Sequence, residues 1–303
     1  MRLSCAALCV AAVTSFAAPA LPQDRVTLGS GRLFTNDFFG DGRDRWRTGS
    51  YTYSLVRGPD WTGDLPGRPG AVLEYRLRSE IIAPLNTGGA GDRPYAGVLA
   101  FGMFTHFSMG ETDVSLGAEV LAMGPQTGVS DAQAAYHDFL GLPEPFGPET
   151  QLGDAVHLGA VAEARRTVRI SETFSVRPFV EAQAGVEDMA RIGVDALIGP
   201  VGQDDLWLRD PVTGHLYRAT SEPAVGALGV TFGADWAAVG DSVYLPESRG
   251  VAPRDDRVRV RAGLHTQVAP DVTWFYGLTW LGPEFEGQDE GQLTGSLKLN
   301  FNF

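Results

Sequence analysis

One stretch of this sequence combines residue types and spacing that suit a catalytic helix. Gln133 and His137 are four residues apart within residues 130–141, so in a helix both side chains project from the same face. The stretch contains good helix formers, a Ser130 that can cap its start and a Gly141 suited to the left-handed position after its end. A histidine displayed in this way can take a proton from water near neutral pH. The alternative interpretation is a structural or solvent-exposed histidine.

A second group of polar residues lies near the N-terminus. Asn36 and Asp37 end a strand-like run and precede the Gly- and Asp-containing residues 38–44. This composition is typical of a turn, but carboxylate, amide and backbone carbonyl oxygens are also the ligands that Ca²⁺ prefers. Thr48 is on the inward face of the next predicted strand and lies at the same end as Asp37 if the two strands form a hairpin. A turn and a hard-cation site are therefore both open interpretations.

The elements that must position these residues show the alternation of β-strands. At residues 293–303, apolar or small side chains occupy the odd positions and polar ones the even positions. Side chains alternate between the two faces of a strand, and an arginine facing lipid would cost roughly 2–4 kcal/mol at the midplane. Charged faces should therefore point inward. The pattern recurs at residues 48–55, 73–81, 113–120, 176–187 and 257–265.

This pattern predicts an all-β fold, an antiparallel transmembrane β-barrel with a short helix in an extracellular loop. About ten to thirteen strands can be placed between the Gly-, Pro- and Asp-rich turns. Charged inward faces favour a plugged interior over an open channel. Aromatic residues recur on the apolar faces, as in the interface girdles of barrels, and they are Tyr51, Tyr53, Tyr75, Trp274, Tyr276 and Trp280.

The N-terminus has the pattern of an export signal. Residues 1–20 contain a positively charged start, an apolar stretch and an Ala-Pro-Ala site for cleavage after Ala20. We therefore expect a signal peptide over residues 1–20 and one barrel domain over residues 21–303. Cys5 and Cys9 both lie inside the signal, so the processed chain would have no thiol for a disulfide, a thiolate metal site or a nucleophile.

The charge balance excludes one class of partner. The formal net charge is −13, whereas a nucleic-acid-binding surface needs basic residues to neutralise phosphates. Solvated loops and a polar lumen account for the acidic balance. The sequence also contains no HExxH, G-x-S-x-G or P-loop motif.

Several short blocks follow one another along the chain in a characteristic order and spacing. They are Asn36-Asp37, the D-R-W-R-T-G run at 44–49, D-R-P-Y-A-G at 92–97, Gly124-Pro125, Gln133 with His137, Gln151, and E-F-E-G-Q at 284–288. The D-R-P-Y-A-G block and the Q-x-x-x-H helix are the most specific of these. In the order and spacing of these blocks, nearly the whole predicted mature chain resembles the outer-membrane lipid A 3′-O-deacylases, the LpxR family.

The resemblance implies twelve strands and an active site between the barrel wall and the loop helix, near the outer surface of the membrane. It further implies that His137 is the general base and that Asp37 is a ligand of a Ca²⁺ that polarises the ester carbonyl. By the same resemblance, Asn36, Thr48 and Gln133 are oxyanion-stabilising or orienting groups.

One departure from the family leads to a further expectation. The family can carry a lysine just before the D-R-P-Y-A-G block, which the resemblance places near the substrate phosphate, but residues 86–91 contain none. Arg93 is then the residue expected to supply the phosphate contact.

The function implied is Ca²⁺-dependent removal of the 3′-linked acyloxyacyl chain from lipid A, by a monomer embedded in the outer membrane with lipopolysaccharide as its partner. An outer-membrane phospholipase is an alternative with similar chemistry. A non-catalytic barrel, either a pore or a structural protein in which His137 and Asp37 are incidental, is an alternative from another class. The loop helix and the cluster of Asn36, Asp37 and Thr48 favour an enzyme, because a simple pore needs neither.

Overall fold

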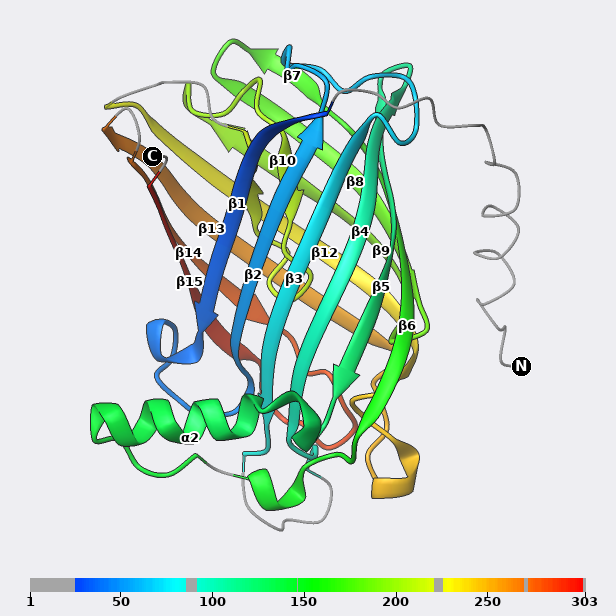
Figure 1. Ribbon diagram of the computed structural model, residues 1–303, viewed down its shortest axis with the longest axis vertical. Coiled ribbons are helices and arrows are strands. Elements are labelled where there is room, and N and C mark those ends of the chain that lie inside the picture. The colour runs from blue at the N-terminus through cyan, green and yellow to red at the C-terminus, as the bar shows by residue number, and fades with distance from the viewer. Residues whose placement is uncertain (1–24, 86–91, 146, 221–225, 270–271, 302–303) are drawn as a thin grey trace.

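Twelve antiparallel strands close into a barrel in the computed structural model of the chain (Figure 1). The structure describes residues 25–85, 92–145, 147–220, 226–269 and 272–301. The predicted signal peptide and residues 86–91 lie outside these ranges. The first and last strands pair with each other, and β6 pairs with β8. The predicted all-β barrel is confirmed.

The wall strands are long and their connections lie at the two rims. They are β1 (Val26–Asn36), β2 (Trp46–Gly58), β3 (Val72–Ala83), β4 (Ala96–Met109), β5 (Thr112–Met123), β6 (Ala155–Arg166), β8 (Phe174–Ala184), β9 (Glu187–Ile198), β12 (Leu228–Ser242), β13 (Asp256–Ala269), β14 (Val272–Leu281) and β15 (Gln292–Phe301). The shorter elements are η1 (Asp37–Phe39), η2 (Pro125–Thr127), α2 (Val129–Leu140), η3 (Pro148–Thr150), β7 (Val168–Ser171), β10 (Trp207–Arg209), β11 (Leu216–Arg218) and η4 (Glu247–Arg249).

The alternation of side chains sets the facing of each strand as predicted. On β3, Glu74 and Glu80 are almost fully buried in the lumen, whereas Leu77 is 54% exposed on the outer face. Thr52 on β2 is buried on the inner face, whereas Thr48 is buried at the irregularity of β2 between Trp46 and Gly49, where its hydroxyl bonds Asp44. The continuous strand expected over residues 176–187 is wrong, because the chain turns between β8 and β9, where Gly185 has a φ of 95°.

The lumen is filled by a hairpin that folds inward from the connection between β9 and β12 (Figure 1). Its strands, β10 and β11, are buried along their whole length. The Thr52 hydroxyl donates a hydrogen bond to Asp210 (2.9 Å), and Arg209 pairs with Glu163 (2.5 Å) and Asp195 (3.0 Å). The predicted plugged interior is therefore confirmed, and the charged inner faces are used to hold the plug.

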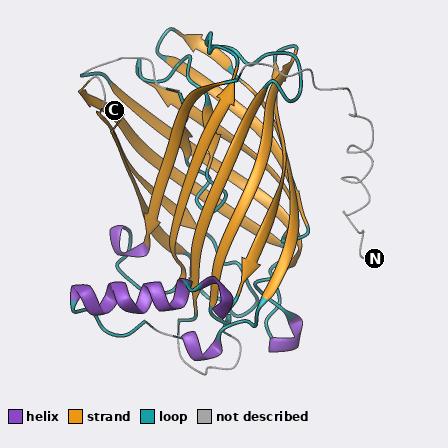
Figure 2. Cartoon of the chain, viewed as in Figure 1, coloured by secondary structure: helices purple, strands orange, loops and turns teal. Residues whose placement is uncertain are grey.

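Helix α2 lies across one rim of the barrel (Figure 2). It begins at Val129, so the predicted Ser130 cap is wrong. Gly128, with a φ of 65°, precedes the helix, and the amide of Val129 donates to the hydroxyl of Thr127 (3.3 Å). Gly141 is left-handed at the other end, as predicted. Within the described ranges, no helix is both long enough and apolar enough to cross a bilayer.

Candidate functional site

Sequence blocks that are far apart along the chain meet at the rim that carries α2. The loop between β1 and β2 contributes η1, and the β3–β4 and β14–β15 connections end at the same rim (Figure 1). The residues predicted for the site divide between two neighbouring groups here. One group surrounds Asp37 and the other lies under α2.

Asp37 is held in place at the end of β1. Its carboxylate accepts a hydrogen bond from the amide of Arg45 (3.0 Å), and the side-chain oxygen of Asn36 caps η1 by accepting from the amide of Phe38 (2.8 Å). Gly295 lets η1 press against β15, because a Cβ there would lie 2.3 Å from the carbonyl oxygen of Phe39. Asp37 is consequently only 3% exposed.

The surroundings of Asp37 are rich in oxygen and negative charge. The Thr48 hydroxyl donates to Asp44 (2.5 Å) and also interacts with Asp37. Burial of the carboxyl, together with the nearby carboxylates of Asp44 and Asp41, raises the pKa of Asp37 to about 7, although the hydrogen bonds from Arg45 and Thr48 oppose this. The predicted hairpin, with Thr48 beside Asp37, is therefore confirmed.

These donors fit a hard cation in their chemistry. They include the carboxylates of Asp37, Asp41 and Asp44, and carboxylate oxygens are among the ligands that Ca²⁺ prefers. The pKa of Asp37 is raised chiefly by burial and further by two neighbouring carboxylates, so a positive charge at this place would be favourable. Among the described residues, no group of three or more His, Cys, Asp or Glu side chains is arranged to hold a metal by itself, so any Ca²⁺ here would need other oxygens as well.

His137 is oriented by the chain segment that follows the helix. Its Nδ1 lies 2.6 Å from the carbonyl oxygen of Pro143. A carbonyl can only accept, so Nδ1 carries the proton and donates it, which leaves the lone pair of a neutral imidazole on Nε2. The ring is partly exposed. This arrangement produces an oriented proton acceptor at the rim.

Gln133 connects α2 to the D-R-P-Y-A-G block. Its side-chain oxygen accepts a hydrogen bond from the hydroxyl of Tyr95 (2.8 Å), and both residues are buried. Burial and the carboxylates of Asp44 and Asp131 raise the pKa of Tyr95, which keeps its proton on the hydroxyl. Tyr95 therefore lies between the two groups of residues. This bond fixes the orientation of the Gln133 amide, whose NH₂ group is its hydrogen-bond donor.

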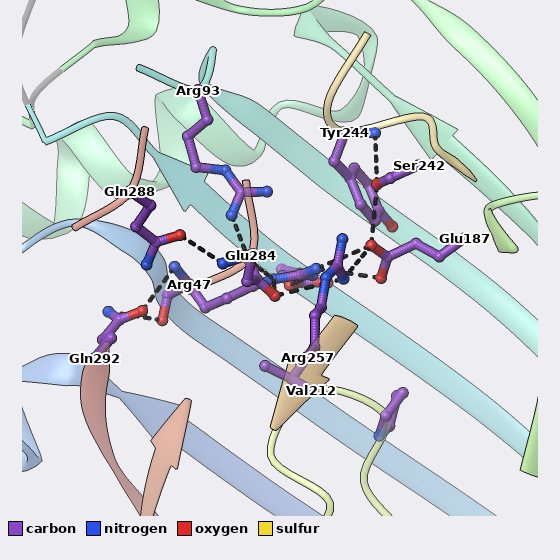
Figure 3. A network of polar contacts seen from close by, with 12 residues as sticks. Arg47, Arg93, Glu187, Val212, Ser242, Tyr244, Arg257, Glu284, Gln288 and Gln292 are labelled. Carbon is purple, nitrogen blue, oxygen red and sulfur yellow. Dashed lines mark hydrogen bonds and ion pairs between the residues drawn. The ribbon is translucent and has the colours of Figure 1, made fainter. Parts of the chain in front are cut away.

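Arg93 belongs to the buried network of charged side chains drawn in Figure 3. It is 1% exposed and pairs with Glu284 (2.5 Å), which also binds Arg47 (3.1 Å). Burial raises the pKa of Glu284, but the guanidinium groups of Arg47, Arg257 and Arg93 outweigh this and hold it well below its usual range. The expected contact of Arg93 with a substrate phosphate stays a prediction.

The structure brings together Asn36, Asp37 and Thr48, and it separately places Gln133 and His137 on α2. Among the residues that the structure describes, no hydrogen bond or ion pair joins His137 to the Asp37 group. Two residues in this region received no role from the sequence: Asp44 and Tyr95. Both belong to the blocks at 44–49 and 92–97, so their membership in those blocks was the available signal.

Comparison with known proteins identifies the family. The family model described as Outer membrane protein LpxR matches residues 3–303. LpxR from Salmonella typhimurium has a similar structure, with a TM-score of 0.75 and 16% identity over 91% of this chain and 100% of that chain. The β-domain of the Bordetella autotransporter BrkA follows with a TM-score of 0.44 and 9% identity over 91% and 99%. No curated protein matches. Because the family model covers nearly the full length, the chain belongs to the outer membrane protein LpxR family.

Proposed function

We propose that this protein is a Ca²⁺-dependent esterase that removes the 3′-linked acyloxyacyl chain from lipid A in the outer leaflet, with His137 as the general base. The observation that carries the proposal is the orientation of His137, whose Nδ1 is tied to the carbonyl of Pro143 (2.6 Å) and whose Nε2 is left as an acceptor. The long loop 124–154 is at the α2 rim, and barrels place their longer loops on the outer side of the membrane. The imidazole is therefore next to the leaflet that contains lipid A.

The polar side chains around this position suit ester hydrolysis. In the proposed reaction, Nε2 of His137 takes a proton from water while the water oxygen attacks the ester carbonyl. The ester C–O bond then breaks, the acyl chain leaves as a carboxylic acid, and the imidazolium returns the proton to the departing 3′ oxygen of the sugar. The side-chain oxygens of Asn36 and Gln133 are both engaged as acceptors, by Phe38 and Tyr95 respectively. Each amide thus offers its NH₂ group, and such fixed donors are what a developing oxyanion needs. Thr48 helps to hold Asp37 and Asp44 in place.

Ca²⁺ belongs to the proposal because the donors at the β1–β2 connection fit it. Asp37 would hold the ion, with Asp44 and the oxygens of the surrounding loop as the other candidates. When bound, a Ca²⁺ would supply positive charge that stabilises the oxyanion of the ester.

The activity itself is the first test. Expression in an outer membrane and mass spectrometry of the extracted lipid A should show loss of one acyloxyacyl chain, and chelation of Ca²⁺ should abolish that loss. The vector without the gene is the control. Unchanged lipid A alongside newly released lysophospholipid would contradict the proposed substrate and support a phospholipase. If a correctly folded barrel forms neither of these products, the result would support a non-catalytic role.

The pKa of Asp37 predicts how the requirement for Ca²⁺ depends on pH. A cation binds the ionised carboxylate, and the pKa is about 7 in the fold. Protons should therefore compete below that value, so that the half-saturating Ca²⁺ concentration rises about tenfold per pH unit on the acid side and levels off on the alkaline side. Half-saturation is measured from lipid A deacylation at a series of pH values.

Two variants sharpen this measurement. Asp37→Asn should lose Ca²⁺ activation at every pH, whereas Asp131→Asn, an exposed aspartate on α2, should keep the wild-type profile. A half-saturating concentration that does not change with pH in the wild type would exclude Asp37 as the titrating ligand.

A further inference from the structure

One stripe of side chains on α2 is buried at the start of the helix and exposed at its end. Val129, Gln133, Tyr136 and Leu140 are four, three and four residues apart, so they share one face. Val129 and Gln133 are 6% and 7% exposed, whereas Tyr136 and Leu140 are 55% and 47% exposed. Helix α2 packs on β3 and β4, and Val129 at its start lies against Gly97 of β4, where an added Cβ would be 3.0 Å from the Cβ of Val129. The second half therefore carries the same face beyond the barrel, and Figure 1 shows the helix extending past the barrel outline.

The exposed part of the helix is amphipathic. Phe139 is 84% exposed and Leu142, just past the helix, is 43% exposed. Asp131 and Asp138 are seven residues apart and lie on the side opposite the stripe. Large apolar side chains in a contiguous exposed group mark an interaction surface. At the N-terminal end of the helix the stripe faces the barrel rim. Because the helix is straight (Figure 1), the stripe faces the same direction at the C-terminal end, where that direction leads toward the membrane.

The barrel wall near this rim is also apolar and aromatic. Phe34 on β1 and Tyr51 on β2 are paired across the two strands and are 38% and 41% exposed on the outer face. Phe38 on η1, at the end of β1, is 72% exposed. Aromatic residues at this height are typical of the membrane interface of a barrel. The apolar end of α2 therefore continues a lipid-facing surface.

We propose that the C-terminal end of α2 inserts into the outer leaflet of the membrane. Tyr136, Phe139, Leu140 and Leu142 contact lipid, while Asp131 and Asp138 remain in water. An amphipathic helix in this position lies with its apolar face about 5–10 Å into the boundary between headgroups and acyl chains. The inference depends on the membrane location of the barrel and is independent of the deacylase activity.

Single-cysteine labelling can test the insertion. The only cysteines of the chain are Cys5 and Cys9, both in the predicted signal peptide, and the unsubstituted protein carried through the labelling reports any background. Nitroxide labels are placed on Phe139→Cys and Tyr136→Cys, with Asp138→Cys as the control on the opposite face. The full-length barrel is reconstituted in phosphatidylcholine vesicles, and its folding is checked by heat-modifiable migration. Collision of each label with oxygen and with a water-soluble nickel complex is then measured by electron paramagnetic resonance.

The proposal predicts that labels at 136 and 139 collide more with oxygen than with nickel, and that the label at 138 shows the opposite ratio. Equal access of nickel to all three positions would overturn the proposal. Protection at 136 and 139 accompanied by spin–spin coupling between copies would also overturn it, in favour of a contact between two barrels. Lipid A analysis of the same variants is a separate measurement, so failure of the insertion and failure of the proposed function can be distinguished.

Discussion

Replacing His137 with alanine should lower the rate of lipid A deacylation by about 10²–10⁴-fold, which is the usual contribution of a positioned general base. The imidazole is held by one hydrogen bond, from Nδ1 to the carbonyl of Pro143, and α2 is anchored separately through the buried Val129 and Gln133. The barrel should therefore fold normally without the ring. Deacylation is measured by mass spectrometry of lipid A, with purified protein in mixed micelles and saturating Ca²⁺.

A matched control and a rescue experiment distinguish catalysis from structure. His157→Ala removes another partly exposed imidazole, on β6, and should leave the rate unchanged. Added imidazole should restore part of the activity of His137→Ala, because a free base can occupy the vacated space. If His137→Ala retains activity within a few-fold of wild type, another group is the base. If both histidine variants lose activity equally, a general structural effect accounts for the loss.

Replacing Glu284 with leucine should lower the free energy of unfolding by about 3–5 kcal/mol, because it leaves buried arginines without their counter-charge. Glu284 binds Arg47 and Arg93, and Arg257 lies 3.6 Å away. Arg47 and Arg257 keep Glu187 as a partner, at 3.2 Å and 2.6 Å. Among the described residues Arg93 pairs with Glu284 alone, so its guanidinium loses most. Unfolding by urea in lipid vesicles, followed by tryptophan fluorescence, measures the change.

Glu111→Leu is the matched control, since Glu111 forms an ion pair with Arg166 in which the two side chains are 77% and 55% exposed. An exposed pair of this kind contributes only about 0–1 kcal/mol. The double variant Glu284→Leu with Arg93→Leu should recover part of the stability, because it removes the stranded charge together with its partner. A Glu284→Leu protein as stable as Glu111→Leu would show that water or a rearrangement compensates the arginines.

The amino-acid sequence alone determined the barrel architecture and the direction in which each wall strand faces. The two-residue period of a strand is a local property of the sequence. A strand with one charged face and one apolar face has a single favourable orientation in a barrel, because the charged face must meet the polar lumen and the apolar face must meet lipid. Thr52 and Glu74 point inward and Leu77 points outward as the alternation requires. The helix that carries Gln133 and His137 was also predictable from local signals, namely its residue spacing and the terminal Gly141.

Strand alternation placed about ten to thirteen strands and the family resemblance implied twelve, but only the tertiary structure decided which segments close the barrel and what fills it. Closure depends on the pairing of β6 with β8 across the connection that contains β7, and strand alternation alone does not reveal that pairing. The plug strands β10 and β11 are buried on all sides, so they lack the two-faced pattern that marked the wall. The start of α2 depended on Gly128 and on the hydroxyl of Thr127, which offered a better first turn than a cap at Ser130.

The candidate site shows the same division. Residue types and the resemblance of short blocks pointed to Asp37, Thr48, Gln133 and His137, but the surroundings that give them chemistry come from distant segments. Tyr95 reaches Gln133 across 38 positions of the chain (2.8 Å), and Arg93 reaches Glu284 across 191 (2.5 Å). The sequence determined which groups are present and which face they occupy. The burial of these groups, their free acceptor atoms and their ion-pair partners depend on long-range contacts. These contacts exist only once the barrel has closed.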